Sequence, residues 1–430
     1  MSKLQELINK LCPNGVEFKP LGEVFEMRNG YTPSKNNPDF WEGGIIPWFR
    51  MDDIRENGRI LSDSIQHITP SAIKGKGLFE ANSFILATTA TIGEHALIIA
   101  DSLANQRFTN LKVRKSLSNL LVTKFIYYYM FIVDDFCKRN TNVSGFASVD
   151  MDKLKKMPFP VPPIEVQEEI VRILDSFSDY ATELQAELQA RKQQYEYYRN
   201  LLLTFNPSAY GCGTDDEQKD GVTTWGGHNY KIQWKKMGDV FEMRNGYTPS
   251  KNNSEFWVGG TIPWFRMDDI RENGRILSDS IQHITPSAIK GKGLFEANSF
   301  ILATTATIGE HALIIADSLA NQQFTNLKVR KSLSNLLVTK FIYYYMFIVD
   351  DFCKKNTNVS GFASVDMDKL KRMPFPIPPL ELQEKIVAIL DRFETLVNDL
   401  TNGLPAEIAA VKDQYEYYRN KLLTFKKLSA

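Results

Sequence analysis

The sequence contains a long internal repeat, and this repeat limits the folds that the chain can adopt. The segment from Val24 to Pro160 recurs 216 positions later as Val240 to Pro376. A solenoid unit is only about 20 to 50 residues long, so a repeat of this length indicates two complete domains. Seven positions differ between the copies, and they are Pro38 and Ser254, Asp39 and Glu255, Glu42 and Val258, Ile45 and Thr261, Arg107 and Gln323, Arg139 and Lys355, and Lys156 and Arg372.

Each copy is followed by a stretch with the spacing of a long helix. Pro162 and Pro163 exclude helix just upstream, and apolar residues then recur at intervals of four and three from Ile170 to Phe205. A matching stretch extends from Ile386 to Phe425. An apolar stripe of this kind needs a partner helix to cover it, so we predict that the two stretches pack together as a coiled coil.

The second helical stretch is longer than the first. Equivalent residues are offset by 216 near Leu390 but by 220 at Tyr415, so four residues have been inserted. An insertion of four shifts a heptad stripe. The insertion lies beside Asn402-Gly-Leu-Pro405, and a proline at this position predicts a kink or a break.

Within each copy, short segments punctuated by Gly, Pro and Asn predict strands and turns, and the run from Leu120 to Phe136 predicts an amphipathic helix. The predicted fold class is therefore α+β, with two near-identical, mixed and strand-rich domains. Residues 206–231 show neither helical nor strand periodicity and are predicted to be a linker. The predicted boundaries are 1–161 for the first domain, 162–205 for the first long helix, 206–231 for the linker, 232–377 for the second domain, and 378–430 for the second long helix, kinked near 402–405.

Charge and hydropathy limit the partners and the compartment. The formal net charge is zero, which alone argues weakly against a nucleic-acid partner. The first copy, however, carries 17 basic against 14 acidic residues, whereas residues 164–205 carry 4 against 8. No signal peptide is visible, and the longest apolar run, Phe125 to Val133, is far shorter than the roughly 20 residues of a membrane-spanning helix. We therefore expect a cytoplasmic protein without a membrane partner.

Motifs for catalysis are missing from the sequence. Gly75-Lys-Gly77 lacks the spacing of a nucleotide-binding loop, and no GxxxxGK[ST] pattern occurs. Val161-Pro-Pro-Ile lacks the polar first residue and the aromatic last residue of the tetrapeptide typical of amino-methyltransferases. None of the five histidines has the spacing of a metal ligand. The sequence therefore predicts a protein that is not itself an enzyme and holds no metal.

Five motifs, in this order, resemble the target recognition domains of type I restriction-modification specificity subunits. They are Gly30-Tyr-Thr-Pro-Ser-Lys35, Trp41-Glu-Gly-Gly-Ile-Ile-Pro-Trp48, Thr91-Ile-Gly93, Asn105-Gln106, and Pro158-Phe-Pro-Val-Pro-Pro-Ile-Glu-Val-Gln167. The helix ends Gln194-Tyr-Glu-Tyr-Tyr-Arg-Asn-Leu-Leu-Leu-Thr-Phe205 and Gln414-Tyr-Glu-Tyr-Tyr-Arg-Asn-Lys-Leu-Leu-Thr-Phe425 resemble the conserved helical regions of that family. The resemblance spans nearly the whole chain.

The resemblance implies a subunit that reads double-stranded DNA within a larger complex. Two methyltransferase subunits would supply S-adenosylmethionine and the adenine-flipping pocket, and two motor-nuclease subunits would use ATP and magnesium, so this chain itself would bind no cofactor. The two long helices pack antiparallel in this family, with the domains related by a pseudo-twofold, and would set the spacing between two half-sites while docking the methyltransferase subunits. In the usual family pattern the two domains differ, whereas here they are near copies. We therefore expect nearly equal half-sites on opposite strands, a split palindrome.

Polar residues on the predicted turns are the candidates for DNA contact, because base edges and phosphates are bound by such side chains. In the first copy they are Arg28, Tyr31, Thr32, Ser34, Lys35, Arg50, Arg55, Lys74, Lys76, Thr88, Thr89, Thr91, Asn105, Gln106 and Arg107. In the second copy they are Arg244, Tyr247, Thr248, Ser250, Lys251, Arg266, Arg271, Lys290, Lys292, Thr304, Thr305, Thr307, Asn321, Gln322 and Gln323. Arg107 is informative because its copy is Gln323: if Arg107 reads a base, the two half-sites are not identical.

Three other functions remain open from the sequence. The chain could be a stand-alone DNA-binding regulator, although a neutral protein has little general attraction for phosphates. It could be a coiled-coil scaffold joining two protein-binding domains. It could also be the specificity subunit of a type II-like restriction system, which would share the reading mechanism.

Overall fold

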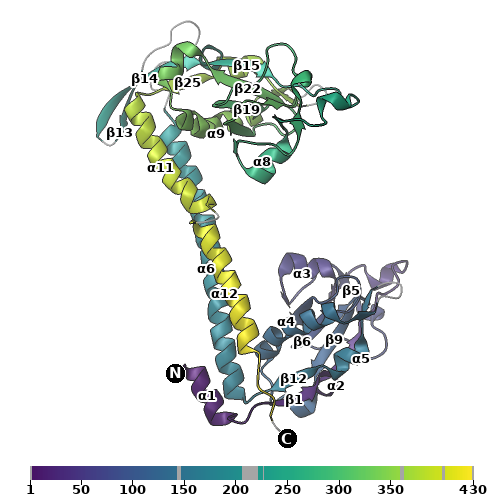
Figure 1. Ribbon diagram of the computed structural model, residues 1–430. Coiled ribbons are helices and arrows are strands. Elements are labelled where there is room, and N and C mark those ends of the chain that lie inside the picture. Colours follow the sequence, from purple (N-terminus) through teal and green to yellow (C-terminus); the bar gives the residue numbers. More distant parts are fainter. Residues whose placement is uncertain are drawn as a thin grey trace. The chain divides into compact units, whose positions relative to one another are not determined.

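In the computed structural model the chain divides into two compact units. The structure describes residues 2–142, 147–205, 221–225, 227–358, 363–399 and 402–428. The first unit contains Met1–Gln185 together with Glu407–Ala430, and the second contains Ala186–Ala406. Each unit therefore combines one repeat domain with parts of the helical stretches (Figure 1).

A five-stranded sheet forms the centre of the first repeat domain. Its strand order is β2-β9-β6-β7-β4, antiparallel except for the pair β4 and β7. The apolar residues of β6 alternate between two cores, as the period of a strand requires. Phe84 and Leu86 pack with α4 (Thr123–Arg139) on one face, whereas Ile85 and Ala87 pack with β3 (Ile46–Phe49) and α3 (Met51–Asn57) on the other. The five strands are β2 (Phe25–Asn29), β4 (Ile60–Leu61), β6 (Ser83–Ala87), β7 (His95–Ile98) and β9 (Phe108–Val113).

Shorter elements complete this domain around the sheet. A three-stranded sheet of order β5-β3-β8 covers one side, and the two-stranded pair β1 and β12 lies near the start of the long helix. The remaining elements are α1 (Lys3–Leu11), β1 (Glu17–Pro20), α2 (Leu21–Val24), β3 (Ile46–Phe49), α3 (Met51–Asn57), β5 (His67–Ile68), β8 (Leu103–Ala104), α4 (Thr123–Arg139), β10 (Thr141–Asn142), β11 (Ser148–Val149), α5 (Met151–Lys156) and β12 (Pro158–Val161).

The second repeat domain has the same elements in the same order. Its five-stranded sheet has the order β15-β22-β19-β20-β17, and its small sheet has the order β18-β16-β21. Its elements are α7 (Met237–Val240), β15 (Phe241–Asn245), β16 (Ile262–Phe265), α8 (Met267–Asn273), β17 (Ile276–Leu277), β18 (His283–Ile284), β19 (Ser299–Ala303), β20 (His311–Ile314), β21 (Leu319–Ala320), β22 (Phe324–Val329), α9 (Thr339–Lys355), β23 (Thr357–Asn358), β24 (Ser364–Val365), α10 (Met367–Arg372) and β25 (Pro374–Ile377).

A β-hairpin precedes the second domain and corrects the predicted linker. Residues 221–225 and 228–231 are not irregular, because β13 (Gly221–Trp225) pairs with β14 (His228–Lys236), and β14 in turn pairs with β25. Tyr230, Ile232 and Trp234 are buried on one face of β14. This alternation extends past Lys231, where the predicted boundary interrupted it. Residues 206–220 of the predicted linker lie outside the described part of the chain.

The first helical stretch is one helix of 40 residues, α6 (Ile164–Leu203). In the first unit it packs against α12 (Leu404–Leu422), with the rings of Phe177 and Tyr418 stacked at 5.5 Å. In the second unit it packs against α11 (Leu380–Asn398), with Tyr198 and Phe393 stacked at 5.8 Å. Both pairings are antiparallel (Figure 1).

The second helical stretch consists of two helices rather than one. α11 ends at Asn398 and α12 begins at Leu404. Across this break Gly403 N donates to Asp399 O at 3.1 Å. Pro405 lies in the first turn of α12, where its missing N–H costs nothing.

The segment that follows each helix enters the core of a repeat domain. Leu423, after α12, is 2% exposed and belongs to the core of the first unit, and Phe425 packs against Phe125 with ring centroids 6.2 Å apart. Leu203 and Phe205 occupy the same places in the second unit. Within the described residues, no helix is both long and apolar enough to cross a membrane.

Candidate nucleic-acid interface

Three loops of the first repeat domain meet beside the start of β9. Tyr31 N donates to Ala104 O at 2.9 Å, and Thr32 Oγ1 is hydrogen-bonded to Gln106. The Tyr31 hydroxyl accepts a hydrogen bond from Lys74 N at 2.8 Å. A hollow of about 280 Å³ lies among these loops, and its lining includes Arg28, Asn29, Tyr31, Lys74 and Lys76. The structure therefore brings candidates from three distant sequence segments together.

Close backbone approach explains one glycine of the first loop. A Cβ atom on Gly30 would lie 2.3 Å from the carbonyl oxygens of Ala104 and Asn105. Only glycine leaves room for this contact. Gly30 thereby allows the loop carrying Tyr31 to lie directly against the loop carrying Asn105 and Gln106.

A fourth loop, Thr88 to Gly93, joins β6 to β7 and lies next to the loop that carries Asn105, Gln106 and Arg107. Thr88 N donates to Arg107 O at 2.9 Å. Ala90, at the tip, has a φ of 64°, a left-handed conformation that costs a non-glycine residue about 1 kcal/mol or more. The second copy repeats this geometry, with Ala306 at a φ of 63°. Strain of this kind concentrates at functional loops, and here it shapes the turn that carries Thr89 and Thr91.

Three of the predicted contact residues are engaged in holding the loops. Arg28 Nη2 donates to Leu78 O at 2.6 Å and its guanidinium lies 4.6 Å from the centre of the Phe79 ring, and burial lowers its pKa. The Tyr31 hydroxyl donates to Ala72 O at 3.0 Å. Thr88 is buried, with its Oγ1 atom 3.1 Å from Thr109 Oγ1. Their equivalents Arg244, Tyr247 and Thr304 make the same contacts. These residues shape the surface more than they present themselves to a ligand.

Other predicted residues are exposed at the loop tips and carry a positive charge, an amide group or a hydroxyl group. In the first copy they are Ser34, Lys35, Lys74, Lys76, Gln106 and Arg107, and in the second they are Ser250, Lys251, Lys290, Lys292 and Gln322. The half-buried members of the set are Thr32, Thr89, Thr91 and Asn105, with Thr248, Thr305, Thr307 and Asn321 in the second copy. Exposed lysines and arginines grouped in this way form a site with the chemistry to bind phosphates and base edges.

The two predicted arginines of α3 differ in position. Asn105 N donates to Phe49 O at 3.0 Å, so Arg50 at the start of α3 lies next to the loop of Asn105. Arg55 lies further along α3 and forms an ion pair with Asp52 at 3.9 Å. Arg266 and Arg271 repeat this arrangement in the second copy, on α8. Arg50 therefore lies beside the loop cluster, and both Arg50 and Arg55 are 3.9 Å from the carboxylate of Asp52.

The one substitution within the candidate set changes the local hydrogen bonding. Arg107 is exposed and its backbone N donates to Asn105 Oδ1 at 3.0 Å. Gln323 keeps that backbone bond, and in addition its side-chain Oε1 accepts from Asn321 Nδ2 at 3.3 Å. The second copy thus presents a shorter, neutral side chain that is partly held by its neighbour.

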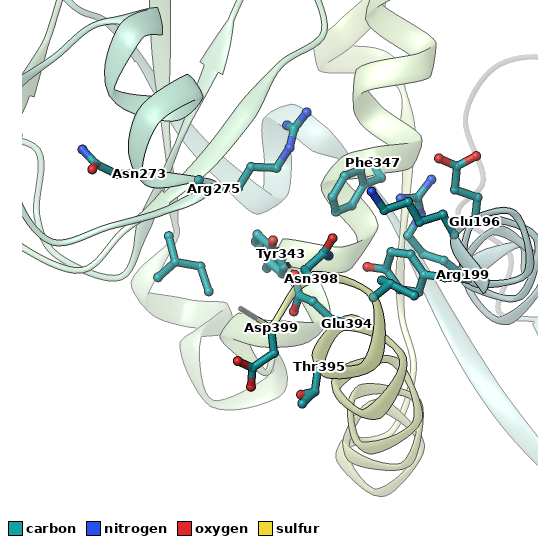
Figure 2. Close-up of a pocket in the computed structure, with 15 residues that line it drawn as sticks. Glu196, Arg199, Asn273, Arg275, Tyr343, Phe347, Glu394, Thr395, Asn398 and Asp399 are labelled. Atoms are coloured by element: carbon teal, nitrogen blue, oxygen red, sulfur yellow. Dashed lines mark hydrogen bonds between the residues drawn. The ribbon is translucent and has the colours of Figure 1, made fainter. Parts of the chain in front are cut away.

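Sequence reasoning missed a second cluster, where each repeat domain meets the helices. In the first unit the guanidinium carbons of Arg59 and Arg419 lie 5.1 and 4.3 Å from the centre of the Phe131 ring. In the second unit Arg275 and Arg199 lie 5.1 and 4.1 Å from Phe347 (Figure 2). These residues are far apart in the sequence, and the available signal was that Arg199 and Arg419 both lie in the repeated helix-end motif.

The cavity in Figure 2 borders this cluster in the second unit. Its volume is about 740 Å³, and Arg199, Arg275, Tyr343, Phe347 and Glu394 are among the residues that line it. Across the part of the chain that the structure describes, no group of three or more His, Cys, Asp or Glu side chains is placed to hold a metal ion.

The model of the type I restriction modification DNA specificity domain matches this chain twice, at residues 13–191 and 230–410. The chain belongs to this family. Members of the family are DNA-recognition subunits of restriction-modification systems, and they do not carry out the catalysis themselves. This chain therefore binds DNA as a specificity subunit that acts with modification and restriction subunits.

Two Escherichia coli relatives match nearly the full chain. The type I restriction enzyme EcoprrI specificity subunit is 36% identical over 428 residues, covering 96% of this chain and 94% of its own length. The EcoR124I/EcoR124II specificity subunit is 36% identical over 453 residues, covering 99% and 98%. The fold is also similar to that of the HsdS subunit from Thermoanaerobacter tengcongensis, at 17% identity, a TM-score of 0.55 and coverage of 96% of this chain and 97% of that one.

Proposed function

We propose that this specificity subunit reads a bipartite DNA site with nearly equal halves, one half by each repeat domain. The observation that carries the proposal is the near identity of the two recognition surfaces. Fourteen of the fifteen candidate residues are the same in both copies, and only Arg107 and Gln323 differ. Two equivalent recognition domains that face opposite strands bind an inverted repeat, as the two subunits of a symmetric dimer do.

The exposed side chains support a division of labour within each half-site. Lys35, Lys74 and Lys76 have the charge and exposure to hold phosphates, and thereby to fix the register on the duplex. Gln106 and Arg107 lie together on one loop and offer the hydrogen-bonding groups that read base edges. We expect base contacts from that loop and phosphate contacts from the lysines.

The helices have the length to set the distance between the half-sites. At a rise of about 1.5 Å per residue, α6 spans roughly 60 Å, which is more than one turn of duplex. We propose that two methyltransferase subunits dock along the helices and bring S-adenosylmethionine. Two motor-nuclease subunits would complete the assembly with ATP and magnesium, and the complex would act on DNA in the cytoplasm.

Methylation mapping by single-molecule sequencing tests the proposal. The host expresses this chain together with its methyltransferase partner, and modified adenines are located on both strands. One split inverted-repeat motif is the expected result. Two unrelated half-sites would contradict the equal-halves proposal, and a lack of sequence-specific methylation with an active partner would contradict the role of the chain as the reader.

A further inference from the structure

Each repeat domain is joined to the helices by an aromatic ring with two guanidinium groups against it. Phe131 on α4 contacts Arg59 of its own domain and Arg419 of α12. Phe347 on α9 contacts Arg275 of its own domain and Arg199 of α6. Guanidinium groups within about 6 Å of a ring centre are attracted by the ring face. We call these two arrangements the first and second arginine clamps.

The domain side of the first clamp is fixed by buried contacts. Arg59 Nη1 donates to His95 O at 3.0 Å and lies 3.4 Å from Asp134 Oδ2. His95 is fully buried, and its Nδ1 atom lies 2.7 Å from the same Asp134 oxygen. His95 also packs edge-on against Phe131, with ring centres 4.7 Å apart. Arg59 and the ring therefore move with the domain.

The helix side of the first clamp is equally well held. Arg419 is only 9% exposed, which is unusual for an arginine, and it also contacts the ring of Tyr415 at 5.4 Å. The second clamp repeats this contact, with Arg199 5.4 Å from the ring of Tyr195. The planar side chain thus lies between a ring of its own helix and a ring of the repeat domain.

The clamp is directly connected to the loops that carry the candidate DNA contacts. Glu94, 3.9 Å from Arg59, accepts a hydrogen bond from Ala87 N at the base of the fourth loop. That loop is bound in turn to Arg107 O through Thr88 N. A rotation of the domain about the helix would therefore displace the reading loops together with the clamp.

We propose that the arginine clamps set the angle at which each recognition domain is held on its helix, and so restrict the spacer lengths that the subunit accepts. Arg419 and Arg199 are positioning residues in this role. The inference depends on the proposed bipartite site. One additional base pair moves a half-site by about 3.4 Å and rotates it by roughly 35°, so a fixed angle excludes the wrong spacer whereas a loosened angle tolerates it.

The test uses the full chain in complex with its methyltransferase partner. Methylation rates are measured on duplexes that contain the mapped half-sites with the natural spacer, or with a spacer one base pair shorter or longer. The variants are R419Q and F131L. K412Q, which removes an exposed charge from the same helix, is the matched control, and F131Y keeps the ring.

For R419Q and F131L we expect the preference for the natural spacer to fall by about fivefold, the value of one cation–π contact. K412Q and F131Y should keep the preference of the wild type, and binding to a duplex with a single half-site should not change in any variant. Equal loss of methylation on all spacers, accompanied by a lower Tm, would reduce the clamp to a purely structural role and overturn the proposal. Unchanged spacer preference in R419Q and F131L would overturn it as well.

The wild-type protein separates this inference from the function on which it depends. If the wild-type complex methylates no bipartite site, the proposed function fails and the clamp proposal fails with it. If the wild type prefers one spacer and the clamp variants do so to the same extent, only the clamp proposal fails.

Discussion

The two units carry nearly the same recognition domain on helices with different chemistry. At one position of the domain–helix junction the first unit has Glu169, bound to Lys3 at 2.8 Å and to Arg172 at 2.7 Å. The equivalent residue in the second unit is Lys385, bound to Glu381 at 2.6 Å and to the hydroxyl of Tyr230 at 3.1 Å. The sign of the charge at this position is reversed, yet the fold of the repeat domain is the same in both units.

A second junction position differs in the number of carboxylates. In the second unit Glu394 accepts hydrogen bonds from the hydroxyls of Tyr343 and Tyr344, at 2.9 and 2.8 Å. The equivalent residue in the first unit is Ser178, and there Tyr128 binds Asp175 at 2.6 Å. The same recognition fold therefore forms with different polar contacts at these two positions of the junction.

The variants with the largest expected effect remove an apolar contact that both units share at the end of a helix. L423A should destabilise the first unit and L203A the second, each by about 3 kcal/mol, because both leucines are almost fully buried. Hydrogen exchange read by mass spectrometry locates the effect, since peptides that contain Arg139 differ in mass from those that contain Lys355. Equal loss of protection in both units from either variant would refute the separation into two units.

The next test makes the reading surfaces identical. R107Q gives the first domain the same candidate set as the second, so the methylated motif should become a perfect inverted repeat. Where Arg107 reads a guanine, discrimination at that base pair should fall by about 1–3 kcal/mol. Methylation mapping measures the change, and Q323R is the reciprocal control. A motif that neither substitution alters would exclude this position from base reading.

A smaller effect is expected from the difference in carboxylates. E394S removes the acceptor for Tyr343 and one of the two acceptors for Tyr344, which still donates to Asp391, and should lower the free energy of unfolding of the second unit by about 1–2 kcal/mol. The reciprocal S178E adds a carboxylate to a junction where Asp175 already binds Tyr128, so it should change the first unit less. Urea unfolding, followed by the same mass-resolved peptides, measures both. If S178E stabilises the first unit as much as E394S destabilises the second, the junctions are interchangeable.

The smallest effect concerns pH. The hydrogen bond from Arg172 is the main cause that lowers the pKa of Glu169 from 4.5 to about 2, so this contact stabilises the folded first unit above pH 4.5 and is lost as the pH falls toward 2. E169Q should remove that dependence and cost about 1 kcal/mol or less at pH 7, because Lys3 and Arg172 are solvent-exposed. Thermal unfolding between pH 2 and 7 measures it, with E168Q as the control on the exposed neighbour. An identical pH profile for E169Q and the wild type would contradict the assignment.

Local sequence patterns predicted the repeat, the long helix and the loops that carry the candidate contacts. The hairpin of β13 and β14 was not predicted. The alternation of buried and exposed residues in β14 crosses Lys231, which is the last residue of the predicted linker. The arginine clamps could not be predicted, since Arg59, Phe131 and Arg419 come from three separate segments and only tertiary packing brings them together. The engagement of Arg28, Tyr31 and Thr88 in framework contacts also depends on tertiary packing, so sequence alone could not separate them from the exposed Lys74 and Arg107.

The core of the first unit requires Leu423 and Phe425, whereas the second unit is a continuous segment from Ala186 to Ala406. During synthesis, domains generally fold as units, from the N-terminus onward. Here the order is reversed, because every residue of the second unit is synthesised before the part of the first unit that begins at Glu407. The first domain to be translated is therefore the last to be completed. Until Phe425 is added, the apolar α4 surface at Phe125 remains uncovered, and a chaperone could bind it.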